Sequence, residues 1–367
     1  MKNLAELQAE CAALGIQVET KGRASKEPYI AALRDYHWRK GHPDEPLPAQ
    51  IMPMLLGSWE DLDEAEAAEI EDDGSGWLVQ QKLDGVRAVL HFEHDGVRIT
   101  SRTVSEVNYR LSEFQTNVSH LTEGFANLVG TVLDGELICP AATIDTGATR
   151  TQDALQATMA ILATTPTNAL KIQTEQNARL AFHAFDILKL QGTDTTQQPL
   201  LNRLDLLNQA VRRAGNPHVV EVPGHVIGKS RIHESLLAAG EEGSVWKKLD
   251  CCYLAGQRVR HWVKRKRGLA VTAFVSNFKP GTPDRGHGGL VGAVEFSCQH
   301  ADGTVSPIGW SSSWTDVERQ AMTAMDTAGR VDLNTKYLQK KAIITGQDLS
   351  ARSRRLRHAR LVCWLDA

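Results

Sequence analysis

A lysine, an aspartate and a glycine lie between two apolar runs in the stretch Gln81-Lys82-Leu83-Asp84-Gly85-Val86-Arg87. The run around Val79 and the run over residues 86–92 are typical of strands, so Lys82 is expected at a strand end, beside a tight turn that Gly85 permits. A lysine held there can act as a nucleophile once desolvation and nearby cations favour loss of its proton. The alternative is a surface Lys-Asp pair beside a hairpin turn, so the residues that follow must decide.

The chain has 367 residues, which is enough for two or three domains that each bury their own core. No run approaches the roughly eighteen apolar residues that a membrane helix requires, and the N-terminus lacks an apolar signal core. We therefore expect a cytoplasmic protein without a membrane partner, and a monomer. The six cysteines include no C-x-x-C pair, so neither a zinc site nor a disulfide framework is expected.

Charge is unevenly distributed along the chain, although the formal net charge is only −3. Residues 60–73 hold nine acidic side chains and no basic one, and we interpret them as a solvated helix face or loop. Basic side chains gather in residues 258–267 and 352–360. Each basic group that neutralises a phosphate releases counterions, so these two runs favour a polyanionic partner.

Two short helices are expected within residues 1–40. The first ends at Gly15 and is predicted by helical spacing of Leu4, Leu7, Cys11 and Leu14. The second begins after Ser25 and has Pro28 in its first turn. The connecting turn carries Lys21, Arg23 and Lys26, and with them the helices resemble a SAP-type DNA-binding module. A plain helical hairpin packed on the next domain fits equally well. Residues 41–76 follow as a proline-containing linker and the acidic segment.

Residues 77–266 alternate short strands with helices, as in an α+β domain. Charge appears where a buried strand would not favour it, in the clusters Ser101-Arg102, Asp134-Gly135-Glu136, Phe185-Asp186, and Glu242-Gly243 with Lys247. Each cluster by itself also fits a turn acid or an edge-strand charge. Their order along the chain therefore carries more information than any one of them.

The segment Trp262-Val263-Lys264-Arg265-Lys266 closes this domain. In a strand, the side chains of Lys264 and Lys266 point to the same face, which is unfavourable unless an anion lies between them. A bound triphosphate is such an anion, and the alternative is a solvent-facing basic strand.

Residues 267–367 are expected to form a smaller, strand-rich domain. Strands are predicted at 271–275, 292–296 and 308–310, a helix at 316–328, and an arginine-rich strand at the end. A segment of about 100 residues with short strands and glycine-rich turns fits a small OB-type barrel, a fold that commonly binds nucleic acid.

Taken in order, Lys82-Leu83-Asp84-Gly85 and the clusters that end with Lys264-Arg265-Lys266 resemble the motif series of ATP-dependent DNA ligases of the small bacteriophage or bacterial type. Two further phrases support the resemblance, Pro199-Leu200-x-x-Arg203-x-x-x-Leu207 and Tyr253-x-x-Gly256-x-Arg258. The resemblance implies an α+β nucleotidyltransferase (adenylation) domain at 77–266 and an OB-fold domain at 267–367. A helical module at 1–40 and a linker at 41–76 would precede them.

This resemblance implies an enzyme that seals nicked double-stranded DNA in a bacterial or phage-infected cell, with ATP and Mg²⁺ or Mn²⁺. Lys82 would attack the α-phosphate of ATP and release pyrophosphate. The AMP would pass to the 5′-phosphate of the nick, and the neighbouring 3′-hydroxyl would then displace it. Positioning and charge neutralisation supply most of the catalysis in such transfers.

Further roles come from the same resemblance. They are nucleotide or 5′-phosphate contact for Arg87 and Arg102, ribose and metal contact for Glu136, adenine stacking for Phe185, metal contact for Glu242, and phosphate contact for Lys247, Lys264 and Lys266. These roles are chemically reasonable, since an aromatic face suits a purine and carboxylate oxygens suit Mg²⁺.

Two positions depart from the family pattern. Gln80 stands where glutamate is common, and its amide oxygen can still accept a hydrogen bond from the adenine amine. The C-terminal motif appears as Arg357-His358-Ala359-Arg360-Leu361, and Leu365 stands where a further arginine is expected. We expect Arg357, with Arg355 and Arg360 close by, to stabilise the leaving pyrophosphate.

Three other functions are compatible with parts of this pattern. An mRNA capping enzyme would prefer GTP, and RNA ligases often lack the C-terminal barrel. A non-catalytic DNA-binding protein on the same fold would not need the clustered charges Lys82, Glu136, Glu242, Lys264 and Lys266. The sequence therefore favours the DNA ligase hypothesis.

Overall fold

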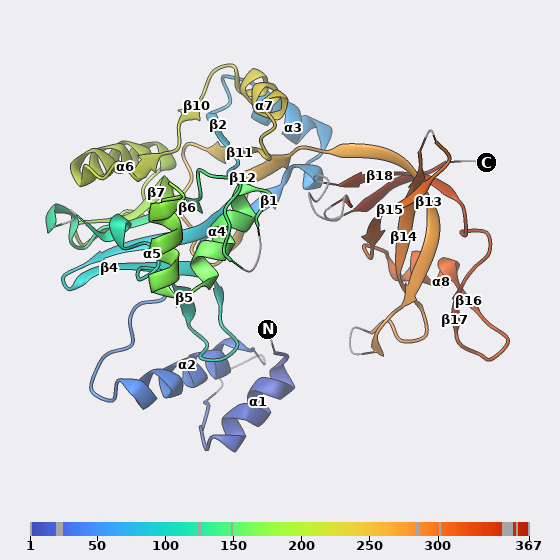
Figure 1. The fold of residues 1–367 in the computed structure, drawn as a ribbon, viewed down its shortest axis with the longest axis horizontal. Coiled ribbons are helices and arrows are strands. Elements are labelled where there is room, and N and C mark those ends of the chain that lie inside the picture. Colours follow the sequence, from blue (N-terminus) through green and yellow to red (C-terminus); the bar gives the residue numbers. More distant parts are fainter. Residues whose placement is uncertain are drawn as a thin grey trace. The chain divides into compact units, whose positions relative to one another are not determined.

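The computed structural model describes residues 2–19, 25–123, 126–147, 150–283, 286–300, 302–346, 355–356 and 359–365. Its elements are shown in Figure 1. The chain divides into two compact units. The first comprises Met1–Leu236 and Ser244–Arg265, and the second comprises Leu237–Gly243 and Lys266–Ala367.

An N-terminal helical pair consists of α1 (Leu4–Ala13) and α2 (Glu27–Gly41). Asn3 caps α1 reciprocally with Glu6, because each side chain accepts a hydrogen bond from the other residue's backbone N–H. Pro28 lies in the first turn of α2, where a missing N–H breaks no helical bond. The buried side chains of the pair form a small core with a residue from the first unit's sheet region: Leu7, Cys11, Ile30, Leu33 and Tyr109.

One sheet of the first unit has five strands in the order β1-β12-β11-β2-β10. Their bounds are β1 (Leu55–Ser58), β2 (Trp77–Gln81), β10 (Gly224–His225), β11 (Gly243–Lys248) and β12 (Arg258–Lys266). Strand β1 runs parallel to β12, and β2 runs antiparallel to β10 and β11. Three helical segments accompany it: η1 (Trp59–Asp61), α3 (Glu64–Glu71) and α7 (Lys229–Ala238). The acidic run thus supplies α3, whose Ile70 packs on Trp77, Val79, Trp246 and Val263.

The other sheet of the first unit has seven strands, in the order β5-β4-β3-β6-β7-β8 with β9 also paired to β7. Their bounds are β3 (Val86–Glu93), β4 (Gly96–Val104), β5 (Leu111–Glu113), β6 (Val132–Ile138), β7 (Ala181–Leu190), β8 (Thr193–Asp194) and β9 (Val219–Glu221). The β7–β9 pair is parallel and the others are antiparallel. The accompanying helices are η2 (Ser119–Thr122), η3 (Ala126–Leu128), α4 (Ala154–Ala163), α5 (Pro166–Glu175) and α6 (Leu200–Ala214).

A shared apolar core joins the two sheets. Leu78 and Trp262 of the five-stranded sheet pack with Val89, Val132 and Leu188 of the seven-stranded sheet. Complete burial of each large apolar side chain contributes about 1.5–3 kcal/mol, so this core stabilises the packing of the two sheets on each other. The seven-stranded sheet also buries side chains of α4, α5 and α6 in a second, larger core.

Lys82 lies on the connection from β2 to β3, and these strands belong to different sheets rather than to one hairpin. Gly85 is required here for a reason that the sequence does not reveal. Its φ is not positive, but a Cβ at this position would lie 2.3 Å from the carbonyl oxygen of Leu137 on β6. The connection can therefore pass close to β6 only if residue 85 has no side chain.

The second unit contains a five-stranded antiparallel sheet in the order β15-β14-β13-β18-β19. Its bounds are β13 (Leu269–Pro280), β14 (Val291–Gln299), β15 (Val305–Ser311), β18 (Lys341–Gly346) and β19 (Arg360–Trp364). Val275, Phe296 and Ile344 contribute to its core. The sheet is strand-rich as expected, and among the described residues no strand pairing joins β15 to β19, so closure into a barrel is not found there. Leu356, just before β19, donates its backbone N–H to the carbonyl oxygen of Ile308 on β15.

The helix expected at 316–328 is shorter in the structure. Helix α8 spans Asp316–Met322, with Thr315 and Glu318 forming its N-terminal cap. The chain then forms β16 (Thr323–Met325), which pairs with β17 (Val331–Leu333). Gly329, at a φ of 73°, occupies the intervening turn, so strand pairing replaces the last helical turns. No described helix is long and apolar enough to span a membrane.

Candidate active site

A pocket lies in the first unit, where both sheets contribute side chains. Residues predicted from the sequence that line it are Gln80, Lys82, Arg87, Glu136, Phe185 and Lys247. The other lining residues are Leu56, Gln81, Leu83, Val222, Val245 and Trp262. The structure therefore gathers motifs that are far apart in the sequence into one cavity.

Arg87 forms a bidentate ion pair with Asp134 on the neighbouring strand, at 2.8 Å and 2.6 Å. Tyr253 also donates its hydroxyl to Asp134, at 2.6 Å. Burial opposes the charge on Arg87, but Asp134 outweighs it and raises the Arg87 pKa above its ordinary value. The guanidinium lies 4.8 Å from the centre of the Phe185 ring, so a permanent cation and an aromatic face meet in the pocket.

Lys247 is a buried cation held between two aromatic rings. Its Nζ lies 3.9 Å from the centre of the Trp262 ring and 4.5 Å from that of Phe185, and it donates to the Phe185 carbonyl at 3.2 Å. Burial lowers the pKa of Lys247 to about 7, with Asp186 opposing and Arg87 reinforcing the shift. An anion in the pocket would favour the protonated form, which gives the site a means to respond to a phosphate.

Gln80 presents a buried acceptor that has no partner in the described structure. Its Nε2 donates to the carbonyl oxygen of Val222 at 2.8 Å, which fixes the orientation of the amide. Its Oε1 is buried and makes no hydrogen bond within the residues described. Because a buried polar atom left unsatisfied costs free energy, this oxygen is suited to accept from a donor on a bound molecule.

The family model of the ATP dependent DNA ligase domain matches residues 53–266. The chain belongs to this family. Among curated relatives, a probable DNA ligase of Pseudarthrobacter chlorophenolicus is 31% identical over 227 residues, covering 61% of this chain and 39% of that protein. A probable DNA ligase of Saccharopolyspora erythraea is 32% identical over 219 residues, covering 59% and 37%. The chain thus matches about two fifths of the length of these relatives.

Solved structures share the fold of this ligase-family chain. One named Pmar-Lig_PreS3 has a TM-score of 0.62 at 19% identity and covers 93% of this chain and 72% of that one. A structure from a study of Lig E DNA ligases has a TM-score of 0.55 at 17% identity and covers 87% of this chain and all of that one. At these identities the likeness concerns the fold alone.

A second arginine–aspartate pair lies next to the pocket of this ligase-family chain, because its aspartate directly follows the pocket residue Phe185. Asp186 follows Phe185 on β7 and binds Arg203 of α6 through two contacts of 2.8 Å, with both side chains fully buried. Arg203 also donates to the carbonyl oxygens of Gln198 and Cys251. Sequence reasoning noted Arg203 only as part of a supporting phrase. The pair fixes β7 against α6 and so fixes the backbone that carries Phe185.

Several predicted residues do not line the pocket. Arg102 is exposed on β4, and Lys264 lies partly buried on β12. Glu242 and Lys266 belong to the second unit, where they form an ion pair of 2.8 Å. Arg357 lies outside the described residues. Sequence reasoning gave Asp134 only a folding or turn role and missed its pairing with Arg87, because the register of β3 and β6 is not visible in a local motif.

The side chains that line the pocket can bind Mg²⁺ only if a bound molecule, such as a nucleotide, supplies further oxygen ligands. The described residues contain no cluster of three or more histidine, cysteine, aspartate or glutamate side chains placed to hold a metal ion. Glu136 is the acidic residue among those that line the pocket. Mg²⁺ in nucleotide sites typically takes one or two carboxylates, with phosphate oxygens and water as its other ligands, so one carboxylate in a phosphate pocket is compatible with it.

Proposed function

We propose that this chain is an ATP-dependent DNA ligase that seals nicks between 3′-hydroxyl and 5′-phosphate ends of double-stranded DNA. The observation that carries the proposal is the composition of one pocket. Lys82 lines it together with a buried free acceptor, an aromatic ring and two buried cations, which are Gln80, Phe185, Arg87 and Lys247. Adenine, ribose and phosphate groups require these complementary features.

Gln80 supports the choice of ATP over GTP. Because one N–H of its amide donates to the Val222 carbonyl oxygen, the Gln80 amide is oriented, and its buried Oε1 is the acceptor that a base can meet. Adenine has an exocyclic amine that can donate to this oxygen. Guanine has a carbonyl at the corresponding ring position and would leave two acceptors facing each other. We therefore assign Gln80 to base recognition and Phe185 to stacking on the base.

Lys82 forms the covalent intermediate in this proposal. Its neutral amine attacks the α-phosphorus of ATP, the bond to the β-phosphate oxygen breaks, and pyrophosphate leaves. The 5′-phosphate of the nick then takes the AMP from Lys82, and the 3′-hydroxyl attacks that phosphate and releases AMP. Arg87 and Lys247 neutralise phosphate charge during the first step, where electrostatic stabilisation is the main contribution available.

Glu136 would hold Mg²⁺ or Mn²⁺ together with the phosphates, and the ion would supply charge neutralisation at the α-phosphate. Glu242 is proposed as a second metal residue. Outside the pocket, we propose contacts of Arg102 with the nick 5′-phosphate and of Lys264, Lys266 and Arg357 with the nucleotide phosphates.

The division into a helical module (1–40), a linker and acidic segment (41–76) that supplies β1 and α3 to the first unit, an adenylation domain (77–266) and an OB-fold domain (267–367) is part of the same proposal. So are a monomeric state and a cytoplasmic location. The SAP-type resemblance of residues 1–40 stays a prediction.

The experiment that tests this function uses ATP or GTP labelled at the α-phosphate, with Mg²⁺. The intact chain should acquire covalent label from ATP and not from GTP, and Lys82→Ala should acquire none. Lys82→Ala should still seal a nick that already carries AMP. Label from GTP would favour a capping enzyme, and preferential sealing of RNA would favour an RNA ligase. No label from either nucleotide would favour a non-catalytic DNA-binding protein.

A further inference from the structure

The turn between β4 and β5 is anchored in the core of the N-terminal helical pair. Tyr109 has a φ of 55°, which is uncommon for a residue with a side chain, and yet it is only 1% exposed. Its hydroxyl donates to the Glu10 carboxylate and accepts from Lys2 Nζ at 3.1 Å. Arg34 of α2 donates from Nε to the Tyr109 carbonyl oxygen at 2.8 Å. Side chain and backbone of this strained residue are thus both held by the helices.

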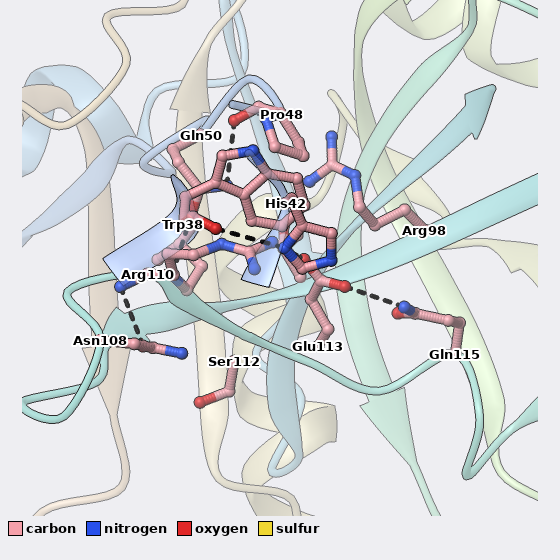
Figure 2. Close-up of polar contacts among 12 residues, drawn as sticks. Trp38, His42, Pro48, Gln50, Arg98, Asn108, Arg110, Ser112, Glu113 and Gln115 are labelled. Atoms are coloured by element: carbon pink, nitrogen blue, oxygen red, sulfur yellow. Dashed lines mark hydrogen bonds and ion pairs between the residues drawn. The ribbon is translucent and has the colours of Figure 1, made fainter. Parts of the chain in front are cut away.

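The next residue along the turn makes a second contact with α2. The guanidinium of Arg110 lies 4.3 Å from the centre of the Trp38 ring, and Trp38 stacks on His42 at 3.8 Å. Arg110 also forms an ion pair of 2.6 Å with Glu113 of β5. Figure 2 shows this group of side chains, with the Glu113–Gln115 hydrogen bond at one side of it. Arg110 therefore links β5 to α2, because it contacts Glu113 of β5 and Trp38 of α2.

Arg102 lies on an irregularity of β4 directly opposite this anchored strand. Between two paired positions, β4 has three intervening residues and β5 has only one. Ser101 closes this bulge, because its Oγ accepts from the N–H of Ser112 at 3.0 Å and donates to the Thr103 carbonyl oxygen at 2.9 Å. A bulge redirects the side chain it carries, and here that side chain is exposed.

We propose that the helical pair is a brace for the β4–β5 edge, and that Arg34 and Tyr109 are positioning residues that set where Arg102 meets the nick. The inference rests on the proposed function, in which Arg102 contacts the 5′-phosphate. The chain of contacts is continuous: Arg34 fixes the turn at Tyr109, the turn fixes β5, and β5 fixes the bulge through Ser112 and Ser101.

The charge on the helices favours this role over direct contact with DNA. Helix α1 contains acidic side chains and no lysine or arginine. Of the basic residues of α2, Arg34 donates to the Tyr109 carbonyl oxygen, Arg39 pairs with Asp35 at 2.8 Å, and Lys40 is exposed. Binding to DNA through phosphates requires several basic groups on one surface, and helices α1 and α2 themselves offer few; Lys21 and Arg23 of the connecting turn lie outside the described residues.

The test compares two arginines of α2 in the full-length chain. Arg34→Ala should slow single-turnover sealing of a pre-adenylated nick by about tenfold, because small displacements of a positioning group have effects of this order or larger. It should leave self-adenylation unchanged. Arg39→Ala removes the same charge five positions along the helix and should change neither rate. Equal slowing by both substitutions would overturn the brace in favour of direct DNA contact.

A double-mutant cycle asks whether the effect passes through Arg102. Arg34→Ala combined with Arg102→Ala should seal no more slowly than Arg102→Ala alone, because the brace has nothing left to position. Multiplying effects would overturn the proposal. Arg34→Lys keeps a donor near the Tyr109 carbonyl and should restore part of the rate, which a general loss of folding would not allow. If the intact chain fails to self-adenylate, the proposed function fails; if it seals normally and Arg34→Ala does too, only the brace fails.

Discussion

Two aspartates on neighbouring strands each bind an arginine, and the two arginines differ in their remaining contacts. Asp134 of β6 and Asp186 of β7 are partners in register, and each binds one guanidinium through two oxygens. Arg203 is fully buried, whereas Arg87 keeps 10% of its side chain exposed and lines the pocket. The same chemical pair therefore serves as a structural tie at one place and as part of a binding site at the other.

The remaining contacts explain the difference. Arg203 completes its hydrogen bonds with two backbone carbonyls and has no surface to offer a ligand. Arg87 is instead adjacent to Phe185, and its aspartate has a second donor in Tyr253. An ion pair can thus orient a cation for a ligand when the carboxylate is satisfied independently and one side of the cation faces a cavity.

The largest expected effect is the loss of stability when the buried Arg203–Asp186 ion pair is broken. Arg203→Ala leaves the Asp186 carboxylate buried without a cation, so the free energy of unfolding should fall by about 3–5 kcal/mol. Urea denaturation of both proteins measures it. The double substitution Arg203→Met with Asp186→Leu removes both charges and should recover most of the loss. A single substitution with stability close to the wild type would mean that Asp186 has another means of neutralisation.

Arg87→Ala should affect chemistry more than stability, because Tyr253 still donates to Asp134. The rate of self-adenylation should fall by about a hundredfold, as is typical when one charge-stabilising donor is removed. Single-turnover labelling with ATP measures this rate. Its unfolding free energy should fall less than that of Arg203→Ala. The reverse order of the two stability losses would contradict the comparison.

Lys247 makes a pH-dependent prediction for the same pocket. Since its pKa is lowered to about 7 by burial, the unfolded chain binds more protons than the folded chain above that pH, and this group makes the fold more stable as pH rises from 7 toward 10. A triphosphate favours the ammonium form, so ATP affinity should fall by up to about tenfold per pH unit above 7. Calorimetry in buffers of different ionisation enthalpy should detect proton uptake on binding, and Lys247→Met should abolish it.

Substitution of Gln80 should have the smallest effect of the four, a modest change in nucleotide affinity. Gln80→Met keeps the volume but removes the acceptor, so ATP affinity should fall by about fivefold, equivalent to one neutral hydrogen bond of about 1 kcal/mol, while GTP affinity should not fall. Gln80→Glu restores the residue common in the family but places a carboxylate against the Val222 carbonyl oxygen. It should therefore bind ATP no better than the natural chain. Equal losses for ATP and GTP in Gln80→Met would show that Oε1 does not face the base.

The sequence predicted which residues line the pocket better than it predicted how the strands bring them together. Motif residues such as Lys82 and Phe185 carry a chemical signal in a few neighbouring positions, and the pocket gathers them. The pairing of Asp134 with Arg87 depends on strand register, and the separation of β2 and β3 into two sheets depends on long-range pairing. Neither is present in a local pattern. Tyr109 gave no signal at all, because its burial requires helices that lie about 70 to 100 residues earlier in the chain.

Because Lys82 lies between two sheets, a group attached to it can affect how often the two sheets separate locally. One wall of the pocket, with Gln80 and Lys247, belongs to the five-stranded sheet, and the other, with Arg87 and Phe185, belongs to the seven-stranded sheet. A nucleotide joined to Lys82 and stacked on Phe185 would bridge the seam between them. The two sheets would then separate less often, and amide protons along β2 and β3 would exchange with solvent more slowly in the adenylated protein. The covalent intermediate would thus also act as a cross-link within its own fold.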